Sequence, residues 1–502
     1  MIKSVTEYLD ASAKKYPDKI AFANKRSTMT FSRLRNESRK IASYIIKYNA
    51  FRRPIAIYLE KSPECVAAFL GVVYSGNYYT PLDTSMPKTR IEKILSTLQP
   101  KLIITDRNHY EEVKSFMETV LVVDYEECLR GQVDNSAIDR VVNMVTDADI
   151  LYILFTSGST GNPKGVVIPQ RSVIDYIEWF TDKFKLSQND TLGNQAPLYF
   201  DLSIQDVYAT LKTGCTTYLL EKELFAFPIN LMQYLADKRV NIIMWVPSAL
   251  CLVANLKALR AKQLPKLRMV LFCGEVMPNK HLNQWRQAMP KTLFVNLYGP
   301  TETCDASAYF IVDREFADDE PLPIGFPCNN TDIFVLNSEN KLVSGDEIGE
   351  LCIRGTCLAY GYYHEKKKTL AAFVQNPLQD CYPETIYRTG DLVRYNERGE
   401  IMYVSRKDFQ IKHMGHRIEL GEIEIAASSI AGVEQCACIY DDKRKKIVMF
   451  YTGAVDKNNI LKKIQSMIPE YMVPQNLIQL KIMPLNLNGK IDRTLLKNYK
   501  KV

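Results

Sequence analysis

The segment Phe155–Val167, FTSGSTGNPKGVV, combines residue types that bind phosphate. It holds three glycines, four hydroxyl side chains and one lysine, Lys164. Glycines let backbone N–H groups turn toward one point, hydroxyls add donors, and the ammonium adds a positive charge. The apolar run Ile150–Phe155 predicts a buried strand that ends where the glycines begin. The loop is not a Walker A motif, because that motif needs Ser or Thr after its lysine and Gly165 follows Lys164. We predict a phosphate-binding loop; the alternative is a flexible Ser-Gly linker.

Length and composition are those of an ordinary globular protein. The chain has 502 residues, of which 46% are hydrophobic and 24% charged, enough for about two to four domains. Met1–Phe22 contains no apolar signal-peptide core, and no run approaches the roughly 18 apolar residues of a membrane span. We therefore expect a cytoplasmic protein with no membrane partner. Twelve cysteines without a C-x-x-C pair favour reduced, buried thiols over a zinc site or a disulfide framework.

The positive charge is concentrated near the C-terminus. The formal net charge is +7, and residues 409–502 hold 15 Lys plus Arg against 9 Asp plus Glu, an excess of six. The basic residues are dispersed except at Lys443–Lys446, and no nucleic-acid-binding motif accompanies them, so we expect no nucleic-acid partner. Two interpretations stay open, a solvated basic face and a docking face for an acidic protein.

The pattern of apolar segments predicts an α/β protein with two domains. Short apolar runs alternate with helical patterns up to about residue 330, which indicates helix-covered parallel or mixed sheets. Close-spaced strands with turn glycines then predict an antiparallel, β-barrel-like section. After Asp408 we expect a small α+β domain with a helix over Arg417–Ile430, strands at 436–442 and 446–453, and two more helices. The predicted domains are residues 1–407 and 408–502.

Seven motifs occur in the order typical of one enzyme superfamily. They are Tyr78–Asp83, the loop Phe155–Val167, Asn296–Glu302, Gly349–Gly355, Tyr387–Asp391, Lys407–Glu424 and Pro484–Arg493. The sequence resembles the adenylate-forming superfamily of acyl-CoA synthetases, peptide-synthetase adenylation domains and luciferases. NQAPLYFDLSIQDVY and LFCGEV resemble in particular the D-alanine–carrier protein ligases. The resemblance implies that ATP, with Mg²⁺, adenylates an amino acid, and that the acyl group then passes to a thiol.

The resemblance also implies a nucleotide site. In this family the glycine-rich loop holds the β- and γ-phosphates, and the residue matching Glu302 binds magnesium. Tyr298 would stack on adenine and Asp391 would accept from the ribose hydroxyls. The implied catalytic residues are Lys490, Lys164, Glu302 and Thr156. The implied nucleotide-binding residues are Thr156, Ser157, Gly158, Ser159, Thr160, Gly161, Lys164, Asn296, Tyr298, Gly299, Thr301, Asp391, Tyr403, Arg406 and Lys490.

Lys490 lies far along the chain from the loop, which implies a moving domain. The family places this lysine between the substrate carboxylate and the attacked phosphate, and hinges its C-terminal domain at the residue matching Asp408. After rotation, Gly415 would give a thiol arm close approach to the backbone. Ser405 departs from the family, which usually has Gly before Arg406.

The acid to be activated is expected to be an amino acid. Asp201 matches the carboxylate that pairs with a substrate α-amine. The implied substrate-binding residues are Asp201, Leu202, Gln205, Trp245, Leu271, Cys273, Gly274, Leu297, Asp305 and Ala306. Trp245 favours a small substrate. Asp305, if buried, requires a hydroxyl or an ammonium to satisfy it; alternatively it faces water.

Three functions are compatible with these residues. The first is an amino-acid ligase that loads a separate, acidic, phosphopantetheinylated carrier protein, since only twelve residues follow Lys490. The second is an acyl- or aryl-CoA synthetase, against which Asp201 argues. The third is an inactive nucleotide-binding scaffold, against which the retained charged residues argue, since Lys164, Glu302, Asp391, Arg406 and Lys490 are all present.

Overall fold

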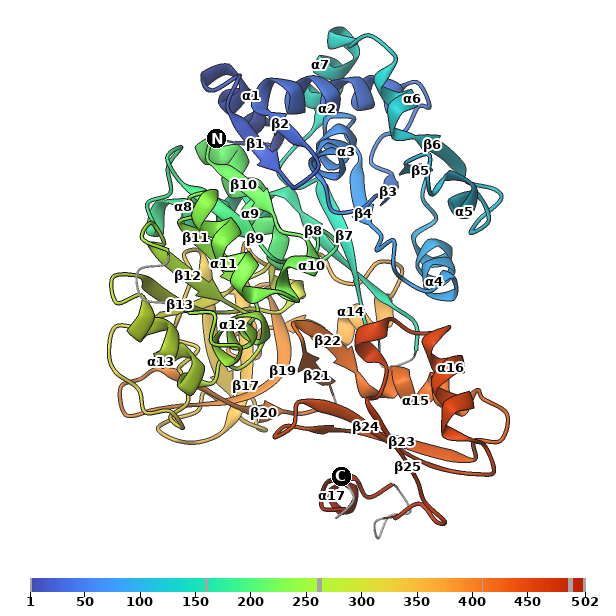
Figure 1. Cartoon of the computed structure of the whole chain (residues 1–502), viewed down its shortest axis with the longest axis vertical. Helices are drawn as coiled ribbons and strands as arrows, with labels where there is room; N and C mark the ends of the chain where they lie inside the picture. The colour runs from blue at the N-terminus through green and yellow to red at the C-terminus, as the bar shows by residue number, and fades with distance from the viewer. Residues whose placement is uncertain (1, 159–160, 260–263, 409, 486–490, 500–502) are drawn as a thin grey trace. The chain divides into compact units, whose positions relative to one another are not determined.

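The computed structural model describes residues 2–158, 161–259, 264–408, 410–485 and 491–499. The chain divides into two compact units (Figure 1). Unit 1 comprises residues 1–83, 100–154 and 166–407, and unit 2 comprises residues 84–99, 155–165 and 408–502. The glycine-rich loop thus belongs to the same unit as the C-terminal segment.

A nine-stranded sheet forms the centre of unit 1, with the strand order β15-β14-β13-β12-β11-β9-β10-β1-β2. Strands β13, β12, β11, β9, β10 and β1 are parallel to one another, and β2, β14 and β15 pair antiparallel at the two ends of the sheet. The carboxyl ends of the parallel strands therefore meet at one edge, where ligands bind in open α/β sheets. The strands are β1 Ile20–Ala23, β2 Thr28–Thr30, β9 Thr191–Asn194, β10 Thr216–Leu219, β11 Ile242–Trp245, β12 Met269–Phe272, β13 Leu293–Tyr298, β14 Ala308–Ile311 and β15 Phe326–Pro327.

The helices of this part carry an apolar face toward the core. Helix α9 starts at Leu202, whose N–H donates to the Asp201 carboxylate, and ends at Thr213, followed by Gly214 with φ +73°. A glycine with positive φ is a standard C-terminal helix cap. Helix α9 packs on α1 and α8, and α12 on α11 and α13. The helices are α1 Thr6–Lys15, α8 Gln170–Lys183, α9 Leu202–Thr213, α10 Lys222–Phe225, α11 Pro228–Asp237, α12 Pro247–Asn255 and α13 Asn279–Ala288.

Two further sheets belong to unit 1, apart from residues 155–156 of β7 and 164–165 of β8, which belong to unit 2. A six-stranded sheet has the order β6-β5-β3-β4-β7-β8, and a five-stranded antiparallel sheet has the order β16-β17-β19-β18 with β20 paired to β19. The mixed α/β fold class is confirmed. The six strands are β3 Pro54–Tyr58, β4 Tyr78–Pro81, β5 Leu102–Thr105, β6 Leu121–Asp124, β7 Ile150–Thr156 and β8 Lys164–Pro169. The five are β16 Thr331–Leu336, β17 Gly349–Gly355, β18 Phe373–Gln375, β19 Thr385–Tyr395 and β20 Ile401–Arg406. The remaining helices of unit 1 are α2 Phe31–Ile46, α3 Pro63–Tyr74, α5 Tyr110–Lys114, α6 Tyr125–Leu129, α7 Asn135–Met144, η1 Thr301–Thr303 and α14 Lys366–Ala372.

Unit 2 has a hydrophobic core of its own, to which both its sheets and helices α15, α16 and α17 contribute. A two-stranded hairpin and the sheet β23-β24-β25 supply its strands, and α15 packs on β23 and α16. The elements are α4 Lys88–Leu98, β21 Gln410–His413, β22 His416–Glu419, α15 Leu420–Ser428, β23 Gln435–Asp441, β24 Lys446–Thr452, α16 Lys457–Gln465, η2 Glu470–Met472, β25 Asn476–Gln479 and α17 Arg493–Lys497.

The start of the helix predicted over Arg417–Ile430 is wrong. Arg417–Glu419 belong to strand β22, and the helix starts at Leu420. Met414 and Gly415 have φ of +52° and +81°, as a two-residue hairpin turn requires. The turn pairs β21 with β22 and so delays the helix.

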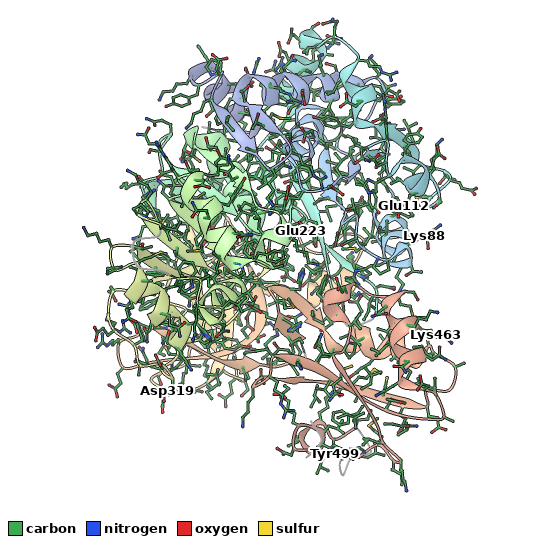
Figure 2. The ribbon with its side chains drawn as sticks, in the orientation of Figure 1. Lys88, Glu112, Glu223, Asp319, Lys463 and Tyr499 are labelled. Carbon is green, nitrogen blue, oxygen red and sulfur yellow. The ribbon has the colours of Figure 1, made fainter. Side chains whose placement is uncertain are left out.

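The charged side chains labelled in Figure 2 lie at the surface, and most cysteines are shielded from solvent. Figure 2 shows the charged side chains of Lys88, Glu112, Glu223, Asp319 and Lys463 projecting from the ribbon that carries them. Eleven of the twelve cysteines are buried or half-buried free thiols, and Cys381 is exposed. In the described part of the chain, every helix is too short or too polar to cross a membrane.

Candidate nucleotide and amino-acid site

A tight loop follows β13 at the carboxyl edge of the nine-stranded sheet. Cys304 and Asp305 both have positive φ, +58° and +71°, and the Ser307 N–H closes the loop on the Tyr298 carbonyl at 2.7 Å. A Cβ on Gly299 would lie 2.1 Å from the Asp305 carbonyl oxygen, so only glycine fits there. Two consecutive non-glycine residues in the left-handed region mark strained backbone, which concentrates at functional sites.

Glu302 is held rigidly within this loop. Its side chain is fully buried, Tyr362 donates its hydroxyl proton to Oε1 at 2.6 Å, and the Glu302 carbonyl accepts from the Ala359 N–H at 2.9 Å. A preoriented carboxylate oxygen is a hard ligand that suits Mg²⁺. The residues present therefore fit the ion. Tyr362 was not predicted, and no local pattern in the sequence links it to Glu302.

Three residues expected to bind the nucleoside contact one another within unit 1. Tyr298 at the end of β13 donates its hydroxyl to Asp391 on β19. Arg406 on β20 donates to the other oxygen of Asp391 at 2.9 Å. Burial, and then the Asp391 charge, raise the pKa of Tyr298, so the phenol stays protonated and remains a donor. Tyr403 lies on the same strand as Arg406 and is 37% exposed, and Asn296 donates to the Pro323 carbonyl at 2.8 Å.

Asp201 joins helix α9 to the same loop. Its Oδ1 accepts from the Leu202 N–H at 2.9 Å, and its Oδ2 accepts from the Thr301 hydroxyl at 2.5 Å. The predicted amine-binding carboxylate is thus bonded to a residue one position before Glu302.

The other predicted substrate-binding residues surround the carboxyl ends of β11, β12 and β13. Trp245 is fully buried, and its indole N–H donates to the Gly193 carbonyl at 2.9 Å. Asp305 is only 2% exposed, so the alternative that it faces water is wrong. Leu202, Gln205, Leu271, Cys273, Leu297 and Ala306 are also buried, and Gly274 is half-buried.

Gln205 and Tyr176 of α8 are buried and hydrogen-bonded to each other, and Asp305 is buried as well. The Tyr176 hydroxyl donates to Gln205 Oε1 at 2.6 Å. Burial, and next the negative charge of Asp201, raise the pKa of Asp305 well above its usual value. Among the described residues, Asp305 Oδ2 and Gln205 Nε2 find no hydrogen-bond partner. Tyr176 was not predicted.

The glycine-rich loop is bonded to other segments of unit 2. Ser157 donates to the Arg417 carbonyl at 2.6 Å and accepts from the Glu419 N–H at 3.2 Å. The Gly158 N–H donates to Glu422 Oε2 at 3.3 Å, and Gly161, with φ +76°, accepts at its carbonyl from Lys93 at 3.1 Å. A carboxylate therefore accepts a hydrogen bond from an N–H group expected to bind phosphate.

Glu422 is paired with Arg90 of α4, and both side chains are 3% exposed. Thr156 Oγ1 is buried and, within the described part of the chain, has no partner. Lys164 begins β8 and is buried. Ser159, Thr160 and Lys490 lie outside the described residues.

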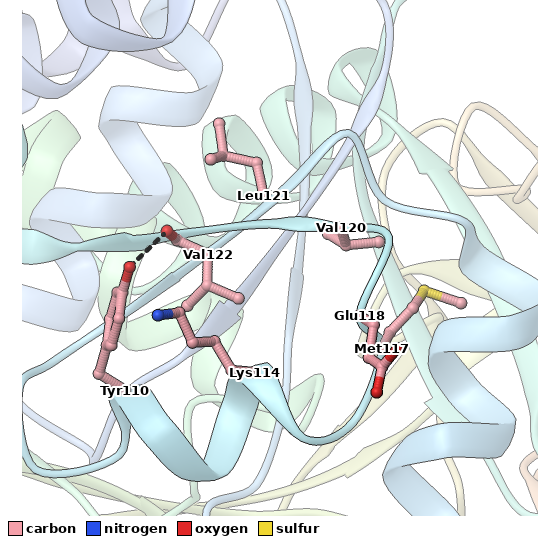
Figure 3. Close-up of a pocket in the computed structure, with 7 residues that line it drawn as sticks. All are labelled: Tyr110, Lys114, Met117, Glu118, Val120, Leu121 and Val122. Atoms are coloured by element: carbon pink, nitrogen blue, oxygen red, sulfur yellow. Dashed lines mark hydrogen bonds between the residues drawn. The ribbon is translucent and has the colours of Figure 1, made fainter.

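A surface pocket of about 340 Å³ lies elsewhere in unit 1, between α5 and β6 (Figure 3). Its lining includes Tyr110, whose hydroxyl donates to the Val122 carbonyl at 3.4 Å. None of the predicted site residues lines it, so this pocket adds nothing to the candidate site. The described residues also contain no group of three or more His, Cys, Asp or Glu side chains placed to hold a metal ion.

Comparison with known proteins decides the family. Residues 9–363 match the family described as AMP-binding enzyme. The chain belongs to this family. It is also 31% identical over 512 residues to the D-alanine–D-alanyl carrier protein ligase of Bacillus licheniformis, covering 99% of both chains.

Other relatives differ in how much of them the chain spans. The chain is 32% identical to zwittermicin A synthase ZmaJ of Bacillus cereus, covering 96% of this chain and 92% of that protein. It is 32% identical to tyrocidine synthase 3 of Brevibacillus parabrevis, covering 97% of this chain but only 7% of that much longer protein. Among solved structures, the Vibrio cholerae adenylation domain AlmE in complex with glycyl-adenosine-5'-phosphate aligns with a TM-score of 0.86 at 22% identity, covering 99% and 98% of the two chains. At 22% identity, the similarity to this structure shows a shared fold alone.

Proposed function

We propose that this protein is an amino acid–carrier protein ligase, which forms an aminoacyl-AMP from ATP and then passes the aminoacyl group to the phosphopantetheine thiol of a separate carrier protein. The observation that carries the proposal is Asp201, a carboxylate held by Leu202 and Thr301 at the carboxyl edge of the parallel strands. Full-length similarity to D-alanine–D-alanyl carrier protein ligases supports the same reaction class.

In the first half-reaction, Asp201 pairs with the α-ammonium of the amino acid. The substrate carboxylate oxygen then bonds to the α-phosphorus of ATP as the bond to pyrophosphate breaks. Asp391 and Arg406 hold the ribose, and Lys490 stabilises the charge on both reacting oxygens. Glu302 would hold Mg²⁺, which neutralises phosphate charge when bound. Positioning and charge stabilisation account for most of the catalysis in such phosphate chemistry.

In the second half-reaction, the carrier thiol loses its proton and its sulfur bonds to the acyl carbon, while AMP leaves with the electron pair of the mixed-anhydride bond. We propose that residues 408–502 rotate about Asp408 between the two steps. This withdraws Lys490 and brings the hairpin turn at Gly415 to the thiol arm. Gly415 already has the positive φ that a close backbone approach uses.

The carrier protein is expected to be acidic and to act in trans. Lys443–Lys446 are exposed at the turn between β23 and β24, with Lys446 as the first residue of β24, and Arg444 is paired with Asp441 at 3.9 Å. Such a cluster attracts an acidic partner over roughly a Debye length of about 8 Å at physiological salt. We therefore expect kcat/KM for the carrier to fall as salt rises, while pyrophosphate exchange changes little.

Amino-acid-dependent ATP–pyrophosphate exchange over all L- and D-amino acids tests the first half-reaction, and transfer to a phosphopantetheinylated carrier protein tests the second. Exchange with one or a few amino acids, followed by carrier loading, is the expected result. If coenzyme A is a better acceptor than any carrier and salt has no effect, the protein is an acyl-CoA synthetase. If no acid supports exchange, the adenylation proposal fails altogether.

A further inference from the structure

We infer that Lys61 is a positioning residue for the amino-acid site, because its ammonium fixes the turn between β9 and α9 that ends at Asp201. The inference rests on the proposed function, in which Asp201 pairs with the α-ammonium of the substrate. Lys61 belongs to none of the seven motifs. It lies in the loop between β3 and α3, 133 positions before Asn194 at the end of β9.

The Lys61 ammonium donates to three backbone carbonyls. Its Nζ lies 3.0 Å from the Asn194 carbonyl oxygen, 3.1 Å from that of Gln195 and 3.0 Å from that of Leu220. An ammonium has three protons and no acceptor, so these three bonds use all of its donors. A neutral amine, which has two protons, would leave one of the carbonyls without its donor. The arrangement of acceptors is therefore matched to a charged lysine.

The three carbonyls lie at the carboxyl ends of two neighbouring parallel strands. Asn194 is the last residue of β9, Gln195 comes next, and Leu220 directly follows β10, which is paired with β9. The chain leaves β9 at this point and then reaches Asp201 at the start of α9. Because Lys61 follows a strand of the six-stranded sheet, its ammonium ties that sheet to the edge of the nine-stranded sheet where the amino-acid site is proposed.

A buried side-chain bond joins the two ends of the same turn. Asn194 Nδ2 donates to Asp206 Oδ2 of α9 at 2.7 Å, and both side chains are buried. Burial lowers the pKa of Lys61 to about 7, and the negative charge of Asp206 opposes that shift. Asn194 thus accepts from Lys61 at its backbone and holds α9 through its side chain. Loss of the ammonium would loosen this anchor, and Asp201, which lies between Asn194 and Asp206 in the sequence, would shift.

A lysine at the opposite end of the same strands provides a matched control. Lys19 donates to the backbone carbonyls of Gln188 and Gly214, which precede β9 and β10, and Lys19 and Lys61 are both half-buried. Each alanine variant therefore removes an ammonium that holds the ends of β9 and β10, at the amino edge for Lys19 and at the carboxyl edge for Lys61. We expect both variants to lower the free energy of unfolding in urea, but we expect altered kinetics for Lys61→Ala alone.

The kinetic experiment is ATP–pyrophosphate exchange with the amino acid that gives the highest rate, and the amino acid and ATP are varied separately. In Lys61→Ala we expect kcat/KM for the amino acid to fall about 10- to 100-fold, since a displacement of about 1 Å caused by a distant substitution can cost about 100-fold. KM for ATP should change little. In Lys19→Ala both quantities should stay close to those of the unaltered protein. An unchanged kcat/KM in Lys61→Ala, or an equal loss in Lys19→Ala, would overturn the inference.

The double variant Lys61→Ala/Asp201→Asn tests whether Lys61 acts through Asp201. If it does, Lys61→Ala should lower kcat/KM for the amino acid much less in the Asp201→Asn background than alone, because residues that act through one group are not additive. Equal fold-losses in both backgrounds would overturn the inference and leave the proposed function intact. Absence of exchange with every amino acid in the unaltered protein would refute the proposed function itself. If Lys61→Ala does not fold, Lys61→Met/Asp206→Asn, which leaves neither buried charge without its partner, takes its place, with Asp206→Asn as the reference.

Discussion

Two substitutions of Asp201 distinguish its role as a negative charge in the amino-acid site from its role as a cap of helix α9. Asp201→Ala removes the cap of α9, the acceptor for Thr301 and the negative charge. Asp201→Asn removes the charge but keeps an oxygen that can accept from the Leu202 N–H, as Asn is among the best capping residues. The two variants therefore differ in stability but share the electrostatic defect.

The expected magnitudes follow from these contacts. Loss of the cap costs about 0.5–2 kcal/mol in the free energy of unfolding, and the lost bond to Thr301 adds about 1 kcal/mol, both for the alanine variant. Asp201 is half-buried, and loss of the charged partner of an ammonium that becomes desolvated on binding costs about 2–5 kcal/mol of binding. Both variants should therefore lose about 30- to 5000-fold in kcat/KM for the amino acid, at about 1.4 kcal/mol for each tenfold change.

The assay is ATP–pyrophosphate exchange with the amino acid and ATP varied separately, beside urea unfolding. KM for ATP should change little. Asp134→Ala, which removes another side-chain helix cap, at α7, is the matched control: it should lower the melting temperature without changing kcat/KM. If Asp201→Asn retains the kinetics of the unaltered protein, Asp201 is only a cap, and the activated acid need not be an amino acid.

Three further predictions address other parts of the chain. Lys490→Ala should nearly abolish pyrophosphate exchange but spare transfer from a supplied aminoacyl-adenylate; equal losses in both steps would contradict the two-orientation mechanism. Arg90→Met leaves Glu422 buried without its cation, so urea unfolding should show a loss of about 3–5 kcal/mol, much of it recovered when Glu422→Leu is added; additive losses would refute the pairing. Burial raises the pKa of Asp206 to about 7, so the folded protein binds that proton more tightly than the unfolded chain. The free energy of unfolding should therefore decrease as the pH rises from about 4 to about 7. The decrease should be on the order of 1 kcal/mol per pH unit relative to Asp206→Asn. Burial lowers the pKa of Lys61 to about 7, so Lys61 is charged in the folded and the unfolded chain over most of that range and adds little to the pH dependence. Parallel pH profiles of the unaltered protein and Asp206→Asn would refute the assignment to Asp206.

The elements that position the site were largely predictable. Apolar runs of four to seven residues followed by glycine or proline predict buried parallel strands, and β7, β11, β12 and β13 lie where these runs occur. Their carboxyl ends carry the motifs because a chain that leaves a parallel strand must turn at that edge. The hairpin β21–β22 was missed because short apolar-polar alternation before a helix does not distinguish a strand from the first helical turn.

The partners of the site residues were not predictable from a single sequence. Tyr362 lies 60 positions from Glu302, and Glu422 lies 332 positions from Arg90. Such contacts depend on the completed topology, and no local sequence pattern around Tyr362 or Arg90 predicts them. The same holds for Tyr176, which on helical spacing alone is an ordinary core residue.

The two carboxylates of the proposed amino-acid site are differentiated by their surroundings, and this differentiation constrains the substrate. Asp201 accepts hydrogen bonds from the Leu202 N–H and from the Thr301 hydroxyl. Asp305 is buried in a strained loop, is short of donors and is opposed by the charge of Asp201, so its pKa is raised. In the proposed reaction Asp201 pairs with the α-ammonium of the amino acid. The raised pKa of Asp305 means that a second negative charge beside Asp201 is costly. A substrate side chain with a positive charge would therefore have to ionise Asp305 against the field of Asp201.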